Sequence, residues 1–194
     1  MIRAIFLDVD GTLISFSTHE IPASARRALT QAHERGVRLF IATGRAANDL
    51  GPLEGIPYDG VVSLNGARCV ANDGRVVSLH PIPRADFERA LALSEEQDFA
   101  MGLELEEGVF VNRVTPDVKR VAHMVAHPVP EQTDLRELFG RVECCQLCFY
   151  FDAETQRRVM AELPTLVASR WCPIFADVNV AGIDKATGME EFMR

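Results

Sequence analysis

The sequence predicts an α/β protein in which a parallel core sheet is interrupted by an inserted α+β domain. Two observations predict this fold. Between residues 2 and 64, short apolar runs alternate with helix-like segments, which is the βαβ pattern of a parallel sheet. After residue 66, hairpin signals and longer helical segments take over. We therefore expect a discontinuous core domain at 1–83 and 181–194, with the inserted domain at 84–180.

The core elements follow from periodicity and from helix-breaking residues. Residues 2–7 are nearly continuously apolar, as in a strand that is covered on both faces. Apolar residues recur at helical spacing over 22–35, and Gly36 is a natural helix end. We expect strands at 2–7, 37–42 and 60–64, a helix at 22–35, and a short helix at 46–50 that Gly51 and Pro52 end.

A hairpin and a linker precede the inserted domain, which is expected to mix strands and helices. Asn72-Asp73-Gly74 predicts a tight hairpin between 69–71 and 75–77, and residues 80–83 form a stiff proline-containing linker. Beyond the linker we expect helices at 84–97, 116–126 and 153–163, and strands at 100–105, 109–113, 142–151, 166–171 and 174–180. The segment 186–194 has the composition of the first turns of a helix.

Composition restricts the class of partner. The chain has 194 residues, of which 47% are hydrophobic and 25% charged, as in ordinary globular proteins. A net charge of −8 disfavours nucleic acid as a partner, so an anion site must be built locally. There is no apolar stretch of membrane-spanning length and no secretory leader. Five cysteines without a disulfide-framework spacing fit a reducing compartment, so we expect a cytoplasmic protein with no membrane partner.

The most specific chemical signal is the string Asp8-Val9-Asp10-Gly11-Thr12-Leu13, which directly follows an apolar run. Two carboxylates that converge on one pocket need a cation or a protonated partner. Mg²⁺ prefers carboxylate, carbonyl and water oxygens, so Asp8 and Asp10 are candidate metal ligands for phosphoryl chemistry. Taken alone, Asp8-x-Asp10 is equally well a surface turn after a core strand.

The full string resembles the first signature of the haloacid dehalogenase (HAD) superfamily of phosphatases and phosphotransferases. Thr43-Gly44-Arg45 resembles the second signature, a Ser or Thr at the end of the second core strand. Asp184-Lys185 resembles the third, a Lys after the inserted cap, and the insertion resembles a Cof-type class II cap of subclass B. This resemblance spans the whole chain. It implies a Rossmann-like core and Mg²⁺-dependent hydrolysis of a small phosphorylated metabolite, such as a sugar phosphate, through an aspartyl-phosphate intermediate.

The resemblance also implies a role for each matching residue. Asp8 would attack phosphorus, Asp10 would protonate the leaving oxygen and then deprotonate water, and Lys185 would balance the phosphoryl charge. Mg²⁺ would be held by the Asp8 carboxylate and by Asp10, through its backbone carbonyl. The candidate phosphate-binding residues are Thr12, Thr43, Gly44, Arg45 and Asn65.

These candidates also have purely structural interpretations. Thr43 alone would be read as a helix cap and Lys185 alone as a solvated surface lysine, but their order around Asp8 favours the catalytic roles. Asn65 is equally well part of a turn, and Arg45 likewise keeps both interpretations.

One signature of the HAD superfamily has no counterpart here. Family members carry an acidic Gly-Asp-x-x-x-Asp type segment on a further strand, whereas this sequence ends at Arg194, nine residues after Lys185. We expect the metal to lose carboxylate ligands, so that activity is weak or absent. Residues 2–7 should have a bare flank, which a second copy could cover as a homodimer. Truncation of a longer chain is the favoured explanation, and a natural short form stays open.

Two other functions stay open: a catalytically inactive phosphate-binding or dimerisation module, and a phosphomutase-like phosphotransferase with the same nucleophile. Two further patterns are weak. Cys145 and Cys148 lie in an apolar strand pattern without a second pair, which favours buried cysteines over a zinc site. His123 and His127 lack a third ligand, which favours an exposed helix face. Residues near expected strand ends that could select the substrate are Glu104, Asn112 and Arg113.

Overall fold

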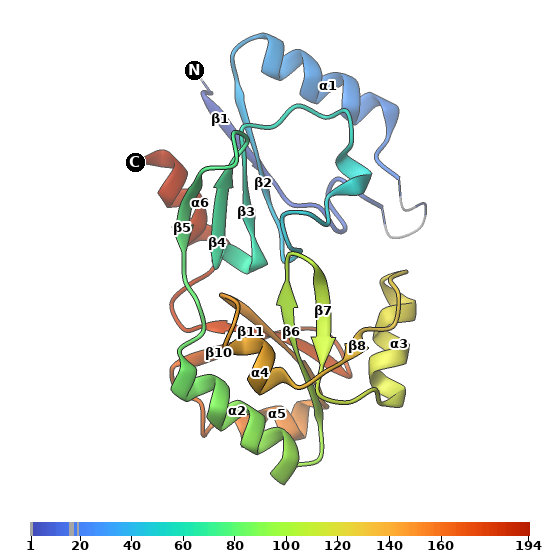
Figure 1. Cartoon of the computed structure of the whole chain (residues 1–194). Coiled ribbons are helices and arrows are strands. Elements are labelled where there is room, and N and C mark those ends of the chain that lie inside the picture. Colours follow the sequence, from blue (N-terminus) through green and yellow to red (C-terminus); the bar gives the residue numbers. More distant parts are fainter. Residues whose placement is uncertain (1, 16–17, 19) are drawn as a thin grey trace. The chain divides into compact units, whose positions relative to one another are not determined.

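The computed structural model describes residues 2–15, 18 and 20–194, and Figure 1 shows their elements. The chain divides into two compact units. Unit 1 holds the residues up to Leu79 together with Ile183–Arg194, and unit 2 is His80–Gly182. Unit 2 thus begins before the expected boundary at 84 because Ile82, in the expected linker, is only 3% exposed and packs in the core of unit 2.

Unit 1 is built on a five-stranded sheet in the order β1-β2-β3-β4-β5. Strands β1 (Ala4–Leu7), β2 (Arg38–Ala42) and β3 (Gly60–Ser63) are parallel, which confirms the α/β prediction. Strands β4 (Arg68–Ala71) and β5 (Val76–Leu79) add the expected antiparallel hairpin. Within the described part of the chain, β1 pairs with β2 alone and lies at the sheet edge, as the expectation of a bare flank required.

Both faces of this sheet are covered by a helix. Leu39 and Ile41 of β2 belong to the apolar core on the side of α1 (Ala23–Glu34). Ala42 belongs to the opposite cluster, together with Phe192 of α6 (Lys185–Met193). Because successive side chains of a strand point to opposite faces, an apolar run without polar interruptions is what a strand between two helices requires.

The short helix expected at 46–50 is not formed. The segment contains a turn in which the Asp49 N–H donates to the Ala46 carbonyl at 3.1 Å, and a 3-10 helix, η1, follows at Gly51–Leu53. Leu50 is buried in the core on the side of α1, and Pro52 cannot continue an α-helix because it lacks an N–H donor. The expectation of a helix N-terminus just after Thr43 is therefore wrong. A second 3-10 turn, η2, spans Leu64–Gly66 at the end of β3.

Unit 2 is a six-stranded sheet in the order β10-β11-β9-β6-β7-β8, with helices packed on it. Its strands are β6 (Ala100–Leu105), β7 (Gly108–Val111), β8 (Glu131–Gln132), β9 (Gln146–Tyr150), β10 (Leu166–Cys172) and β11 (Phe175–Val180). Its helices are α2 (Arg84–Glu96), α3 (Pro116–Met124), α4 (Leu135–Phe139) and α5 (Ala153–Met160). The sequence prediction missed β8 and α4, because two and five residues are too few to show a period.

The two faces of the unit 2 sheet differ in character. Leu103 and Phe149 point into the main apolar core, which α2, α4 and α5 cover. On the opposite face, Val118 and Val121 of α3 pack on part of the sheet. The rest of that face carries polar side chains, because Glu104 alternates with the core residues on either side of it.

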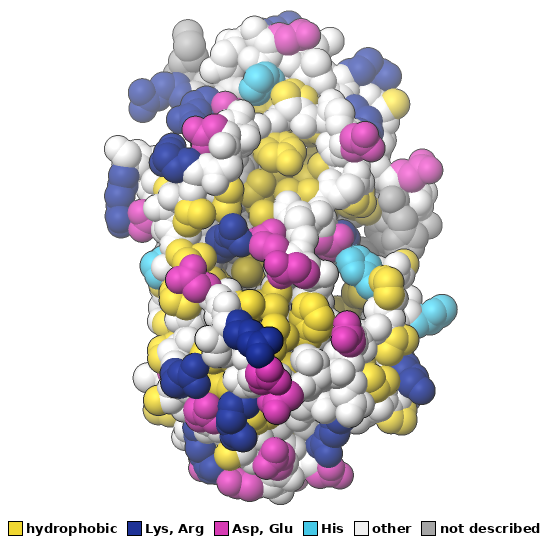
Figure 2. Space-filling model, in the orientation of Figure 1, with side chains coloured by type: hydrophobic (Ala, Val, Ile, Leu, Met, Phe, Trp, Pro, Cys, Tyr) yellow, Lys and Arg dark blue, Asp and Glu magenta, His cyan; other side chains and the backbone are white. Residues whose placement is uncertain are grey.

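The surface carries charges of both signs. On the face drawn in Figure 2, Lys and Arg side chains are interspersed with Asp and Glu side chains. Some charged residues of the chain form ion pairs within one helix, such as Arg84 with Glu88 on α2 and Arg158 with Glu154 on α5. Exposed pairs of this kind contribute roughly 0–1 kcal/mol each, so they do not decide the fold. In the described ranges, every helix is too short or too polar to cross a bilayer.

Candidate active site

The loop after β1 places two aspartates on one side of the chain. Val9, between Asp8 and Asp10, is 1% exposed and packs in the core on the side of α1. The Val9 carbonyl accepts a hydrogen bond from the Ile14 N–H at 2.8 Å, which closes the loop. Gly11 has a φ of 79°, a conformation that glycine adopts without strain. With Val9 anchored inward, its two neighbours project away from that core.

Asp8 is paired with Lys185, which lies 177 positions away in the sequence. The Lys185 Nζ donates to Asp8 Oδ1 at 2.5 Å, and the Thr12 hydroxyl donates to Asp8 Oδ2 at 3.4 Å. The side chains of Asp8 and Lys185 are 38% and 35% exposed, so solvent and small molecules reach both. The structure thus brings together Asp8 of the first signature and Lys185 of the third.

The start of α6 delivers Lys185. Asp184 Oδ1 accepts from the Thr187 N–H at 2.8 Å, and the Thr187 hydroxyl accepts from the Asp184 N–H at 2.9 Å, which is a capping box. A Cβ on Gly66 would lie 1.9 Å from the Asp184 carbonyl oxygen, and a Cβ on Gly188 would lie 2.5 Å from a methyl group of β3. From the sequence, Asp184 is named only beside Lys185 in the third signature, and neither Thr187 nor Gly188 is singled out, although Asp-x-x-Thr before a helix is a capping signal.

Thr43 directly follows β2 and is 1% exposed. Its N–H donates to the Val62 carbonyl at 2.8 Å, and its carbonyl accepts from the Asn65 N–H at 3.0 Å. Its Oγ1 accepts from the Arg45 N–H at 3.1 Å, so its own hydroxyl hydrogen can be donated to a ligand. A Cβ on Gly44 would lie 3.1 Å from Asn65 Oδ1. Three phosphate-binding candidates, Thr43, Gly44 and Asn65, are therefore neighbours.

The guanidinium of Arg45 contacts two carboxylates. Nε and Nη2 donate to the two oxygens of Asp10 at 2.9 and 2.7 Å, and Nη1 lies 3.3 Å from Asp49 Oδ2. The side chain of Arg45 is 24% exposed and that of Asp10 is 43% exposed. The sequence predicted Arg45 as a phosphate-binding candidate. Its contact with the Asp10 carboxylate was not predicted, because a single arginine after a strand does not indicate which acidic residue it will contact.

The donor set at this site fits a hard divalent cation. Asp8 and Asp10 supply carboxylate oxygens, and the backbone of Asp10 supplies a carbonyl oxygen. Mg²⁺ commonly takes one or two carboxylates, keeps several waters and binds substrate phosphate oxygens. These residues therefore offer the ligand types that Mg²⁺ prefers.

Two of the substrate-selection candidates in unit 2 have structural partners. Asn112 Oδ1 accepts from the Met101 N–H at 3.0 Å, and its Nδ2 donates to Ser94 Oγ at 3.0 Å. Arg113 Nη1 donates to Asp98 Oδ1 at 2.7 Å. These bonds join the end of β7 to α2 and β6, so both residues serve the fold of unit 2.

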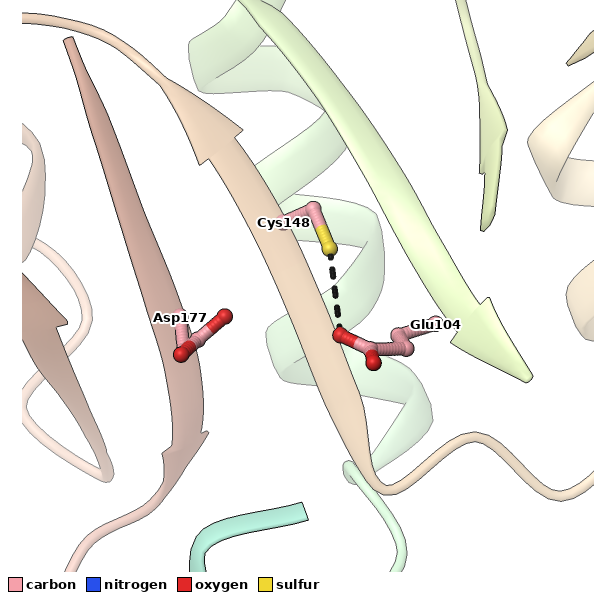
Figure 3. A group of neighbouring side chains, drawn as sticks. All are labelled: Glu104, Cys148 and Asp177. Carbon is pink, nitrogen blue, oxygen red and sulfur yellow. Dashed lines mark hydrogen bonds between the residues drawn. The ribbon is translucent and has the colours of Figure 1, made fainter. Parts of the chain in front are cut away.

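Glu104, the third candidate, belongs to a polar cluster on the sheet of unit 2. Figure 3 shows Glu104, Cys148 and Asp177 on three neighbouring strands, and their ligand-type atoms lie within 4.8 Å of one another. Gln146 Nε2 donates to Glu104 Oε2 at 2.6 Å and to Asp177 Oδ1 at 3.3 Å, so an amide already bridges the two carboxylates. Burial and the nearby Glu104 and Asp177 charges raise the pKa of Cys148, whose thiol donates to Glu104.

The weaker sequence patterns agree with their structural interpretation. Cys145 and Cys148 are buried and belong to no disulfide, which confirms the prediction of buried cysteines. His123 lies exposed in the last turn of α3, and His127 is exposed beyond its end, as expected for a solvated helix face.

Comparison with known proteins identifies the family. A family model described as haloacid dehalogenase-like hydrolase matches residues 5–194. The solved structure of BT1666 from Bacteroides thetaiotaomicron, studied among phosphatases of the HAD superfamily, superposes with a TM-score of 0.94 at 55% identity. That match covers 99% of this chain and 72% of BT1666. The HAD subclass IIB sugar phosphatase BT4131 gives a TM-score of 0.88 at 31% identity, over 99% of this chain and 75% of its own.

A sequence relative points the same way. YkrA of Bacillus subtilis (strain 168), a phosphatase by name, is 26% identical over 195 aligned residues, which cover 97% of this chain and 72% of YkrA. The parallel sheet, the Asp8–Lys185 pair and these matches lead to one conclusion: this chain belongs to the haloacid dehalogenase-like hydrolases, and it is an enzyme of their phosphatase type.

Proposed function

We propose that this protein is a Mg²⁺-dependent phosphatase that hydrolyses a small phosphorylated metabolite through a phosphoryl group bound to Asp8. One observation carries the proposal: Lys185 donates to one oxygen of the Asp8 carboxylate at 2.5 Å, while the other oxygen accepts from the Thr12 hydroxyl at the longer distance of 3.4 Å. A carboxylate is already ionised at neutral pH, so a nucleophile of this kind needs orientation rather than deprotonation.

The first step transfers the phosphoryl group to the protein. Asp8 Oδ2 attacks phosphorus, the bond from phosphorus to the ester oxygen breaks, and that oxygen leaves with the electron pair. Asp10 supplies the proton that the leaving oxygen takes up. Lys185 and the hydroxyl hydrogen of Thr43 face the charge on the phosphoryl oxygens.

The second step releases phosphate. Asp10, now a carboxylate, takes a proton from a water molecule, and the water oxygen attacks phosphorus. The bond between phosphorus and Asp8 breaks, which regenerates the free carboxylate of Asp8 and the protonated Asp10. Bound Mg²⁺ would be held by Asp8 and the Asp10 carbonyl, and it supplies charge neutralisation on the phosphate oxygens.

Substrate class and setting complete the proposal. BT4131 is a sugar phosphatase, and at 31% identity this supports a sugar phosphate as the substrate here. We propose that unit 2 is a cap domain that selects the leaving group, and that five cysteines outside any disulfide suit a reducing cytoplasm. No nucleic acid or membrane is proposed as a partner. The homodimer through the open edge of β1 stays a prediction, which light scattering tests.

The test is a steady-state assay with p-nitrophenyl phosphate and a panel of sugar phosphates, with excess Mg²⁺ and then with a chelator. One carboxylate and one backbone carbonyl make a weak Mg²⁺ site, so the metal concentration must be high. Asp8→Asn should lower turnover about 10³-fold or more. Asp117→Asn is the matched control, because Asp117 makes only a surface pair with Arg120. Turnover that survives both Asp8→Asn and the chelator would rule out the proposal.

A further inference from the structure

We propose that Arg45 is a positioning residue that fixes the carboxyl group of Asp10 for proton transfer, rather than a ligand of the substrate phosphate. The inference rests on the proposed function, because it concerns the group assigned there to carry the proton. It comes from the geometry of the guanidinium, in which Nε and Nη2 each meet a different oxygen of Asp10, at 2.9 and 2.7 Å.

This contact fixes an orientation as well as a distance. Two parallel N–H···O bonds from a planar guanidinium define the plane of the carboxylate that they hold, which a single bond or a lysine cannot do. Asp10 lies on a loop with 43% of its side chain exposed, so without the fork it is free to turn between rotamers. Proton transfer requires a donor within about 2.6–3.2 Å of the reacting oxygen, and a misplacement of about 1 Å can lower the rate about 10²-fold.

Arg45 is itself held in place, as a positioning residue must be. Its N–H donates to Thr43 Oγ1 at 3.1 Å, and its carbonyl accepts from the Leu64 N–H at 3.0 Å. Nη1 contacts both the carbonyl and the carboxylate of Asp49, at 3.4 and 3.3 Å. The guanidinium therefore links the proton carrier to the buried end of β2, beside the hydroxyl of Thr43.

The chain of contacts from Thr43 through Arg45 to Asp10 has a chemical consequence. Thr43 is proposed to hold a phosphoryl oxygen, and Asp10 must reach the ester oxygen on the same phosphorus. A rigid connection between the two sets the distance between phosphate and proton donor. Loss of Arg45 should therefore slow the step that needs an acid, while phosphate binding stays nearly unchanged.

The experiment compares esters with poor and good leaving groups. A simple alkyl phosphate needs a proton on its leaving oxygen, whereas p-nitrophenolate leaves readily without one. The measured quantity is kcat/KM, which reports the steps up to phosphoryl transfer. For Arg45→Ala we expect kcat/KM to fall about 10- to 100-fold with the alkyl ester and less than about 5-fold with p-nitrophenyl phosphate. Added guanidinium ion should restore part of the loss.

The controls separate positioning from folding and from phosphate binding. Asp117→Asn changes a surface pair with Arg120 and should cost little with either ester. In an Asp10→Asn background, Arg45→Ala should cause no further loss with the alkyl ester, because the two residues act as one unit. If Arg45 held phosphate instead, Arg45→Ala would raise KM for both esters equally and inhibition by inorganic phosphate would weaken in parallel. That result would overturn the inference.

A spectroscopic measurement keeps the inference separate from the phosphatase proposal. In arginine-labelled protein, the Nε–H resonance of Arg45, assigned by its absence in Arg45→Lys, should shift when Asp10 is changed to Ala. A resonance that does not respond refutes the fork whatever the turnover. A wild-type protein that hydrolyses neither ester while the resonance still responds refutes the phosphatase proposal and leaves the Arg45–Asp10 contact supported.

Discussion

At the scale of single residues, the site depends on charges placed opposite one another. Asp8 meets Lys185 and Asp10 meets Arg45, so each of the two carboxylates that a phosphatase needs has its own cation. Both pairs are partly exposed, and pairs of this kind contribute little to stability. The geometry of these pairs orients the reacting groups, so substitutions at these residues report on chemistry rather than on folding.

We predict that Lys185→Met lowers kcat about 10²- to 10³-fold, because the cation that faces the phosphoryl oxygens is lost. The thermal midpoint should change little, since the side chain is 35% exposed. Lys119→Met is the matched control, because Lys119 is exposed on α3. Steady-state kinetics and thermal unfolding of the two variants check this, and equal losses of turnover in both would contradict it.

At the scale of elements, the position of Lys185 depends on how closely α6 lies against its neighbours. Gly188 lies where any side chain would meet β3, and Gly66 lies where it would meet the backbone before α6. The capping box at Asp184 then fixes the first turn of the helix. Each of these features acts on Asp8 through the helix, without touching the reacting atoms.

We predict that Gly188→Ala destabilises the protein by about 1–3 kcal/mol, the typical cost of overpacking. The added Cβ would lie 2.5 Å from Val62 Cγ1 and 3.0 Å from Cys69 Sγ, so α6 must move and turnover should fall with stability. Gly51→Ala is the control, because a Cβ there meets nothing within 4 Å. Denaturant unfolding curves compare the variants, and a Gly188→Ala protein as stable as Gly51→Ala would be the contrary result.

Elements of sufficient length could be predicted from the sequence. The strand before Asp8 is a nearly continuous apolar run and the helix at 22–35 has a clear helical period, and the structure has them as β1 and α1. The helix expected at 46–50 was wrong because the packing of Leu50 depends on distant partners that no local window contains. Helix α4 has five residues and no readable period, so it was missed.

The site shows the same division. The pairing of Asp8 with Lys185 was expected from motif order, because the family resemblance relates residues that are far apart in the chain. The paired hydrogen bonds between Arg45 and Asp10 were not expected, because no sequence pattern indicates which side chains of two separate loops will meet. Local motifs indicate which residues matter, whereas the structure is needed to find which atoms meet.

At the scale of the whole molecule, both units bury ionisable thiols, and this gives stability a pH dependence. Burial raises the pKa of the Cys144 thiol to about 12 and that of Cys69 above its usual 9.0. In the unfolded chain the same thiols ionise near their ordinary values. The folded state therefore loses stability as the pH rises above about 9, because only the unfolded state gains the thiolate there.

We predict that the contribution of the buried thiols to the free energy of unfolding is constant below pH 8. It should decline between pH 9.0, the ordinary thiol pKa, and about pH 12. Cys144→Ser should decline less steeply than wild type. Equilibrium unfolding across this range checks the slope. In the same samples, a thiol reagent at neutral pH should label the native protein slowly, because all five cysteines are buried. Fast labelling of the folded protein would show that the thiols are accessible.

The most direct test of the whole account is to trap the phosphoryl group. Asp10→Asn protein, which should release phosphate slowly, is mixed with Mg²⁺ and p-nitrophenyl phosphate, whose leaving group needs no proton, and is then quenched in acid and digested. The account predicts that the peptide containing Asp8 gains the mass of one phosphoryl group, that hydroxylamine removes it, and that Asp8→Asn abolishes it. Turnover by the wild-type protein with no such adduct, or with the phosphoryl group on another residue, would contradict the account.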